Sequence, residues 1–252
     1  MGKPRAPSAT RTAAERITVR GLDEPVEVRR HPAARRMTLR VSRTRRAVIV
    51  TMPMQCDLRQ AGQFLKSHLD WVRERLTSMP EPRPFAHNLL IPLRGTAHRV
   101  VFRGPLRPTD GIVSQLRTPG RRPELHVAGD DEFAPRRLRD WLITQARNDL
   151  AERVTWHCRS LGLRAGRISV RDQTSRWGSC SSTGNLSFSW RLIMAPPQIL
   201  DYVAAHEVCH LAEMNHGPRF WTLVKKTCPR SDEAREWLNV YGLDLHRYGV
   251  QL

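Results

Sequence analysis

The first part of the chain carries short apolar runs that alternate with turn residues. Met37, Leu39 and Val41 stand two positions apart, and a period of two is typical of strands with one buried face. Such runs predict strands over residues 17–19, 26–30, 37–41, 47–52, 88–93, 98–102, 112–116 and 124–127. Between the fourth and fifth run, apolar residues at three- and four-residue steps predict one helix near residues 57–79, which the prolines from Pro80 onward end.

Longer helical patterns dominate the rest of the chain. A stripe of leucines predicts a helix over residues 135–161, with Gly162 as its stop. Three more strands are predicted over residues 168–171, 177–181 and 186–193, and a turn at residues 182–185 joins the last two as a hairpin. Further helices are predicted over residues 199–214, 218–227 and 232–241.

This order of elements predicts an α+β fold class. We expect a disordered tail over residues 1–15 and a β-rich N-terminal region with one helix over residues 16–133. The remainder, residues 134–252, is expected to form a core that contains the β-hairpin and the helix of residues 199–214. A chain of 252 residues can bury such a core without disulfide bonds.

The chain is strongly basic, with 42 Lys and Arg against 24 Asp and Glu. Residues 1–150 hold 29 of the basic and 15 of the acidic side chains, so that part carries a net charge of +14. The arginines at 29–30, 35–36 and 43–46 predict a basic face that attracts polyanions weakly. No aromatic residues are interleaved with these arginines, so the pattern does not indicate a stacking platform for single-stranded nucleic acid.

The cysteines and the apolar runs indicate the compartment. Five cysteines are present, an odd number, and none forms a CxxC pair, which argues against a secreted disulfide framework. No stretch approaches the roughly 20 uncharged apolar residues that a membrane span needs. We therefore expect a cytoplasmic protein without a membrane partner.

One segment of the chain has the spacing of a metal site. His206 and His210 are four residues apart on a predicted helix, so both imidazoles lie on one face and can bind one cation. Glu207 completes the HExxH pattern, in which the glutamate binds and deprotonates a water held by the metal. Cys209 points about 100° away from His210 on the helix, and we interpret it as a small core residue.

A catalytic zinc ion has three protein ligands, so it needs one more besides the imidazoles of His206 and His210. His216 lies six residues after His210, and Asn215 and the Gly217-Pro218 pair offer a turn that would bring it back to the helix. We therefore expect His206, His210 and His216 to hold Zn²⁺.

These residues and the preceding hairpin resemble a known family. Four stretches are similar to the YgjP-like metallopeptidases, which are related to SprT-like and WLM proteases. They are RWGSC at 176–180, NLS at 185–187, WRLI at 190–193 and HEVCHLAEMNHGPRFW at 206–221. The resemblance extends over about residues 26–242 and is strongest over 170–240. It implies a zincin-type core whose ligands are the three histidines and whose base is Glu207.

The neighbours of this segment have more than one interpretation. Arg176, Ser179 or Asn185 could help to hold a substrate oxygen near the metal, or all three could belong to a structural hairpin. Phe220 and Trp221 are interpreted as packing that fixes His216.

We favour a zinc-dependent peptidase that uses a metal-activated water with Glu207 as general base. The same chemistry also fits a nucleoside triphosphate pyrophosphatase that hydrolyses phosphoanhydrides, for which the basic first part would help to hold triphosphate. A third alternative, from another class, is a nucleic-acid-binding protein with a structural metal site.

Overall fold

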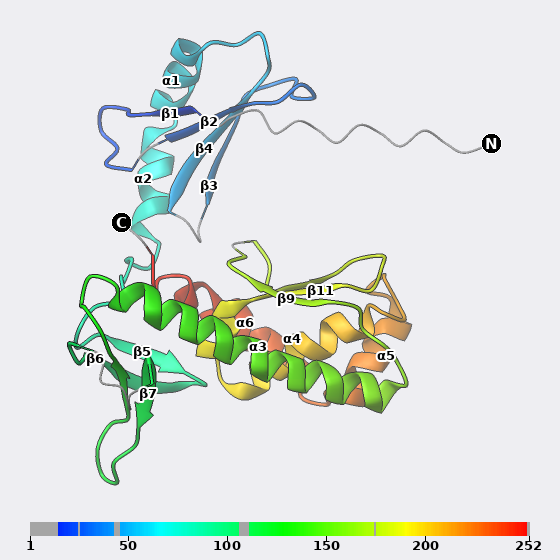
Figure 1. Cartoon of the computed structure of the whole chain (residues 1–252). Coiled ribbons are helices and arrows are strands. Elements are labelled where there is room, and N and C mark those ends of the chain that lie inside the picture. Colours follow the sequence, from blue (N-terminus) through cyan, green and yellow to red (C-terminus); the bar gives the residue numbers. More distant parts are fainter. Residues whose placement is uncertain (1–14, 25, 43–45, 106–110, 174, 251–252) are drawn as a thin grey trace. The chain divides into compact units, whose positions relative to one another are not determined.

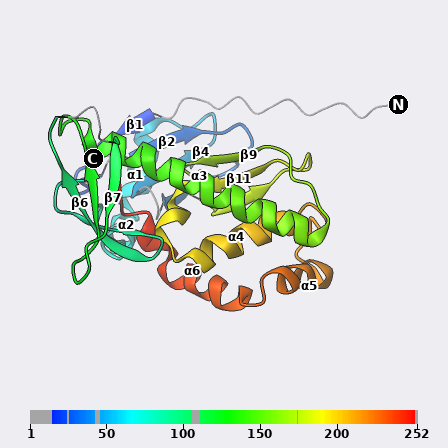
Figure 2. The same ribbon diagram turned by 60° about the horizontal axis from the view of Figure 1, so that its bottom comes forward.

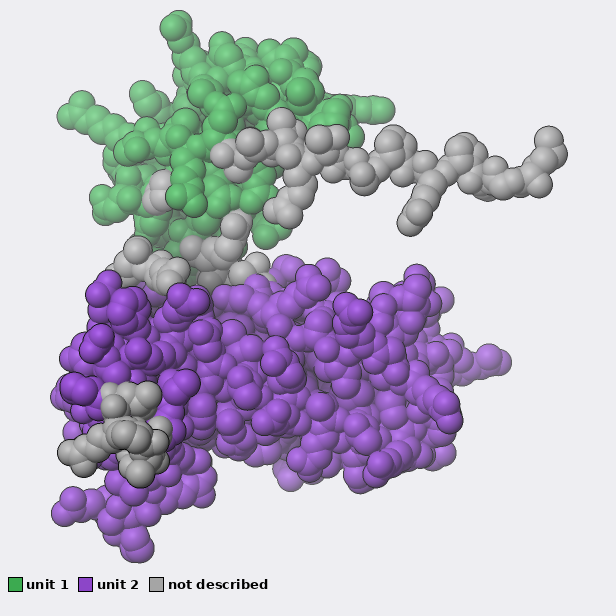
Figure 3. Space-filling model, in the orientation of Figure 1, with its two compact units in different colours: residues 1–79 green, residues 80–252 purple. Residues whose placement is uncertain are grey.

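The computed structural model describes residues 15–24, 26–42, 46–105, 111–173 and 175–250. It divides the chain into two compact units, residues 1–79 and residues 80–252, which are coloured separately in Figure 3. The predicted tail, except for its last residue, and the arginines at 43 and 45 lie outside the described residues. The second unit combines the strands predicted over residues 88–127 with the predicted core of residues 134–252.

Unit 1 is a small sheet covered by helices. Its four strands are β1 (Glu15–Ile17), β2 (Val26–Arg30), β3 (Thr38–Ser42) and β4 (Ala47–Met52), in the order β1-β2-β4-β3. The central pair β2 and β4 is parallel, and both outer pairs are antiparallel. Apolar side chains of β2 and β4 pack with Ala61, Leu65 and Val72 of the helices to form the core of this unit.

The single helix predicted near residues 57–79 is wrong, because the structure forms two helices there, α1 (Leu58–Lys66) and α2 (Leu69–Thr77). At the junction, the Ser67 hydroxyl donates to the carbonyl oxygen of Phe64, and the His68 ring nitrogen lies 2.8 Å from the same oxygen. The backbone amide of His68 bonds to Leu65 instead. Side chains that compete for a helical carbonyl in this way interrupt the helix.

Unit 2 begins with a second four-stranded sheet. Its strands are β5 (Leu90–Leu93), β6 (Thr96–Phe102), β7 (Val113–Leu116) and β8 (Glu124–Val127), in the order β5-β6-β8-β7. Again the central pair is parallel and the outer pairs are antiparallel. The two units therefore contain sheets of the same strand order and pairing.

A long helix connects this sheet to the rest of unit 2. Helix α3 (Ala134–Leu161) packs on the sheet of β5–β8 near its start and on α4 (Pro197–Cys209) further along (Figure 1). Leu138, Leu142 and Leu150 are fully buried, which agrees with the predicted leucine stripe. Gly162 ends α3 with a φ of +66°, a conformation that glycine adopts without strain.

The predicted hairpin is confirmed. Strands β10 (Gly178–Cys180) and β11 (Leu186–Ser189) are antiparallel, β9 (Ile168–Arg171) pairs in parallel with β11, and β10 lies at the edge of the order β10-β11-β9. The strand predicted over 186–193 is wrong in its second half, where Trp190–Met194 form a short 3₁₀ helix. All five residues of that helix are buried, so the run of apolar residues does not reveal its backbone conformation.

Helix α4 lies between α3 and α6 (Figure 2). The two helices after it are α5 (Pro218–Thr227) and α6 (Ser231–Leu245). The helix predicted over 199–214 is wrong at its C-terminal end, since α4 ends at Cys209. The predicted α+β fold class is confirmed, with three small sheets and six α-helices among the described residues. None of the described helices has the length and apolar character needed to cross a membrane.

Candidate metal centre

Helix α4 is anchored in the core of unit 2 and presents polar residues on one side. Val203, Ala204 and Val208 are buried. His206 lies in the last turn of the helix, and His210 directly follows the helix with φ and ψ still in the helical range. The two imidazole rings are therefore one helical turn apart, with their centroids 4.9 Å from each other.

A compact turn brings the third histidine back to α4. After the helix ends, the amides of Ala212 and Glu213 donate to the carbonyl oxygen of Cys209, and the amide of Gly217 donates to that of Asn215. Pro218 then starts α5, as is common at the first turn of a helix. The turn expected from Asn215, Gly217 and Pro218 is confirmed, and it orients the side chain of His216 toward His206.

The three histidines form a cluster that fits a metal ion. One ring nitrogen of each of His206, His210 and His216 lies within 4.8 Å of those of the other two. The Nε2 atoms of His206 and His216 are 3.0 Å apart. In His210, Nδ1 lies 3.0 Å from the carbonyl oxygen of Glu213, which leaves Nε2 for the centre of the cluster.

The protonation state of the cluster also suits a metal. Burial and the neighbouring imidazoles of His210 and His216 lower the pKa of His206 to about 4. Burial is also the main cause that lowers the pKa of His210. Neutral imidazoles are the form that binds metal ions, so the donor set fits a divalent cation at neutral pH.

Two aromatic side chains pack against the cluster of histidines. Phe220 stacks on His210 with ring centroids 4.5 Å apart, and its edge also contacts His216. The indole nitrogen of Trp221 donates to the carbonyl oxygen of His216 at 3.1 Å. The predicted packing role of Phe220 and Trp221 is confirmed, and the predicted core position of Cys209 is confirmed by its complete burial.

Glu207 points toward strand β10 and is 5% exposed. A Cβ atom added at Gly178 would lie only 2.6 Å from both Cγ and Oε1 of Glu207, so this glutamate occupies the space that glycine leaves open. Burial raises the pKa of Glu207 to about 7, although the positive charge of Arg176 opposes the shift. A carboxyl group with such a pKa can accept and release a proton near neutral pH.

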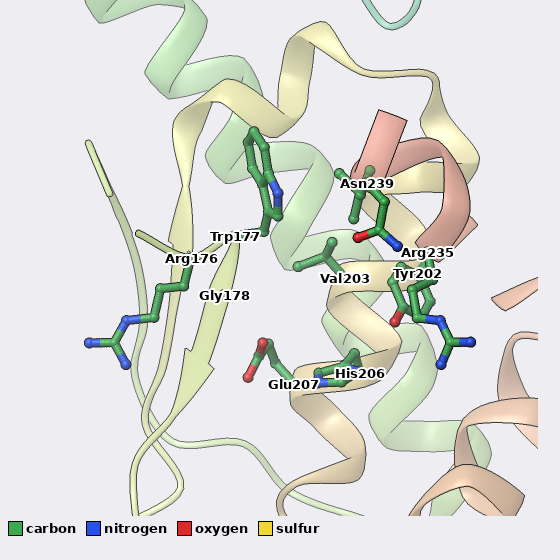
Figure 4. A pocket seen from close by; sticks show the side chains of 10 residues that line it. Arg176, Trp177, Gly178, Tyr202, Val203, His206, Glu207, Arg235 and Asn239 are labelled. Carbon is green, nitrogen blue, oxygen red and sulfur yellow. The ribbon is translucent and has the colours of Figure 1, made fainter. Parts of the chain in front are cut away.

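A pocket of about 300 Å³ opens beside Glu207 and His206 (Figure 4). Figure 4 shows these two side chains near one end of the pocket, with Trp177 and Asn239 at the other end. The pocket is lined by ten residues from β10, α4, α6 and the segment before β10: Arg176, Trp177, Gly178, Tyr202, Val203, His206, Glu207, Arg235, Leu238 and Asn239.

Of the three hairpin residues considered as oxygen-binding groups, Arg176 lines this pocket, whereas Ser179 and Asn185 do not. The side chain of Asn185 accepts a hydrogen bond from the amide of Arg167 and belongs to the hairpin turn. Sequence reasoning missed Tyr202 and Arg235. A signal existed for Tyr202, which precedes His206 by four residues and so lies on the same face of α4.

The chain is similar to known metallopeptidases. A model of the YgjP-like metallopeptidase domain matches residues 35–241. No curated protein matches the chain. The crystal structure of the metallopeptidase zymogen of Pyrococcus abyssi abylysin is similar at a TM-score of 0.34 and 18% identity, and the match covers 37% of this chain and 92% of that chain.

Proposed function

The chain belongs to the YgjP-like metallopeptidase family, and from this we propose that it is a zinc-dependent peptidase of the zincin type. In this proposal His206, His210 and His216 hold the metal and Glu207 is the general base. The observation that carries it is the convergence of three imidazoles within 4.8 Å next to a buried carboxyl group.

The donor set supports zinc as the metal. Three neutral imidazoles are a common ligand set of catalytic zinc, which keeps its fourth position open. When bound, zinc would polarise the scissile carbonyl group and make water more acidic. Glu207 would accept a proton from the attacking water on a carboxylate oxygen and return it to the leaving amine. Its raised pKa, about 7, suits both transfers.

The neighbouring strand supports a peptide as the substrate. Strand β10 pairs only with β11 among the described strands, so its other edge has unpaired backbone groups. An extended peptide could pair with this edge by β-strand addition and lie along the side of the pocket that holds Glu207. The predicted cytoplasmic location is retained in the proposal, because all five cysteines are free thiols.

Metal analysis and peptide hydrolysis test the proposal together. The purified chain should contain one zinc ion, and a chelator should abolish peptide hydrolysis. Glu207→Gln should keep the zinc and lose hydrolysis, because an amide cannot accept the proton. His216→Ala should lose most of the zinc, because two imidazoles alone hold it weakly.

Two results would contradict the proposal. Peptide hydrolysis by Glu207→Gln at the parent rate would show that Glu207 is not the general base. Turnover of nucleoside triphosphates but of no peptide, in the same chelator-sensitive way, would favour the phosphoanhydride hydrolase instead.

A further inference from the structure

The pocket beside the candidate centre contains polar groups that the proposed hydrolysis does not use. His206 and Glu207 form part of its lining, so a substrate whose scissile bond lies at the centre would place a neighbouring group in the pocket. The size, about 300 Å³, is at the lower end of the range for ligand sites. It suits one side chain or one chain end rather than a folded segment.

Three hydrogen-bonding side chains of this pocket make no hydrogen bond to other described residues. Tyr202 is only 5% exposed, yet its hydroxyl makes no hydrogen bond to any other described residue. The same is true of the indole N–H of Trp177 and the side-chain amide of Asn239. Trp177 is half-buried and Asn239 is exposed, so these N–H and O–H donors are accessible from the pocket and available to a ligand that supplies acceptors.

Two arginines border the pocket. The exposed side chain of Arg235 lies over the ring of Trp221, with its guanidinium carbon 5.3 Å from the ring centroid. One guanidinium nitrogen of Arg235 lies 3.8 Å from a carboxylate oxygen of Asp232. That contact is too long for a hydrogen bond, so the guanidinium donors of Arg235 are available to a ligand. Arg176 also lines the pocket and its positive charge acts on Glu207, while its guanidinium points away from the other lining residues (Figure 4).

From this arrangement we propose that the pocket selects a carboxylate group of the substrate, and that Arg235 is the residue that determines this specificity. The proposal rests on the proposed peptidase function. Arginine binds carboxylates in a bidentate manner, and the Tyr202 hydroxyl and Asn239 amide supply further donors. Val203, Leu238 and the ring of Trp177 provide apolar surface for the methylene groups that carry the carboxylate. The carboxylate comes either from an acidic side chain or from the C-terminus of the peptide.

Peptide binding tests this proposal without relying on turnover. The zinc-loaded Glu207→Gln chain is titrated calorimetrically with alanine pentapeptides, blocked at both ends, that carry Glu, Gln, Leu or Lys at the third position. A fifth peptide carries Gln and a free C-terminal carboxyl group, which separates the two sources of the carboxylate. ATP is added to the panel as a phosphate-bearing competitor.

We expect the Glu peptide, or the peptide with the free carboxyl group, to bind about tenfold more tightly than the blocked Gln peptide, as for a charged hydrogen bond. Introducing Arg235→Gln into the Glu207→Gln chain should remove this difference in affinity. Arg159→Gln is the matched control, since Arg159 is exposed at the far end of α3 and does not line the pocket, and it should retain the difference.

The same preference should appear in cleavage by the zinc-loaded parent chain. A peptide library analysed by mass spectrometry should show acidic residues or chain ends beside the cut bond, and Arg235→Gln should lose this pattern. Tightest binding of the Leu peptide, a Glu preference that survives Arg235→Gln, or tighter binding of ATP than of every carboxylate peptide would overturn the proposal. Carboxylate binding that depends on Arg235 in a chain that cleaves nothing would contradict the peptidase function alone.

Discussion

At the scale of single residues, the contact between Gly178 and Glu207 connects the hairpin to the candidate centre. The two residues are far apart in the sequence, and the glutamate occupies the space that any side chain at position 178 would need. Strand β10 thereby fixes where the carboxyl group of Glu207 lies. A proton acceptor that is displaced by about 1 Å can lose two orders of magnitude in rate.

This contact gives a direct prediction for Gly178→Ala. The new Cβ would lie 2.6 Å from Glu207, so the glutamate must move, and we expect kcat for peptide hydrolysis to fall about 100-fold with little change in KM. The zinc content should stay at the parent level, because the side chain nearest to the added Cβ atom is Glu207 and not a histidine. Gly62→Ala is the control, since a Cβ atom added at position 62 would have no atom within 4 Å, and it should retain the parent kcat. An equal loss in both variants would contradict the positioning role.

The residue scale also shows what a sequence can and cannot predict of a site. His206, Glu207 and His210 follow from the helical period, and His216 follows from the turn residues after it, because each of these signals is local. The pairing of Gly178 with Glu207 and the place of Arg235 in the pocket depend on tertiary packing between separate elements. No spacing rule connects such residues, so the pocket could not be predicted.

A buried histidine away from the centre gives a prediction on pH. His246 is 8% exposed and packs against the ring of Trp177 with centroids 5.0 Å apart. Burial, helped by the positive charge of Arg191 and opposed by Asp172, lowers the pKa of His246 from 6.5 to about 4. The unfolded chain therefore binds one more proton than the folded chain between these two pH values.

We expect this histidine to reduce the stability of the folded chain by about 3 kcal/mol as the pH falls from 6.5 to 4. Denaturant unfolding of the zinc-loaded chain at several pH values measures the slope. His246→Gln removes the titrating group, so the free energy of unfolding of this variant should fall less steeply as the pH falls from 6.5 to 4. The difference in slope should correspond to about one proton. Parallel curves for the two proteins would contradict the assignment.

At the scale of elements, one polar network ties three helices together behind the candidate centre. His157 of α3 is fully buried, with Nε2 2.8 Å from a carboxylate oxygen of Asp201 in α4 and Nδ1 2.7 Å from the hydroxyl of Thr227 in α5. Arg153 also donates to Asp201. Burial alone would raise the pKa of Asp201, but the hydrogen bonds from His157 and Arg153 outweigh it and lower the pKa.

We expect Asp201→Ala to destabilise the chain by about 2–4 kcal/mol, because it leaves a buried imidazole and a guanidinium without their acceptor. Asp140→Ala is the matched control, since Asp140 is 57% exposed and its arginine partners are 3.8 and 3.9 Å away. That variant should change the free energy of unfolding by less than about 0.5 kcal/mol. Thermal unfolding measures both, and equal losses would contradict the role of the network.

Elements were predicted best where their boundaries depend on local signals. The leucine stripe and Gly162 predicted α3, and the turn after Cys180 predicted the hairpin. Predictions were wrong where side chains decide the boundary, as at the break between α1 and α2 near Ser67. The shared strand order of the two four-stranded sheets could not be predicted, because pairing between distant strands leaves no periodic signal in the chain.

At the scale of the whole molecule, the two units have separate cores. The buried apolar residues of unit 1 lie between Val19 and Met79, and those of unit 2 lie between Phe85 and Leu245, so neither core contains a residue of the other. The match to the YgjP-like domain spans residues 35–241 and so begins inside unit 1. Unit 1 carries 17 basic and 7 acidic residues, so the predicted binding of polyanions concerns this unit above all and stays a prediction.

Separate cores predict that residues 80–252 fold without unit 1. A domain of this size buries enough apolar surface to be stable alone, and every residue of the candidate centre and its pocket lies within it. We expect the truncated chain to unfold in one cooperative transition and to retain one zinc ion per molecule, measured by calorimetry and metal analysis. An aggregated or zinc-free product would mean that unit 1 is needed to form the centre, and the three histidines would then depend on more than the helices and the turn that carry them.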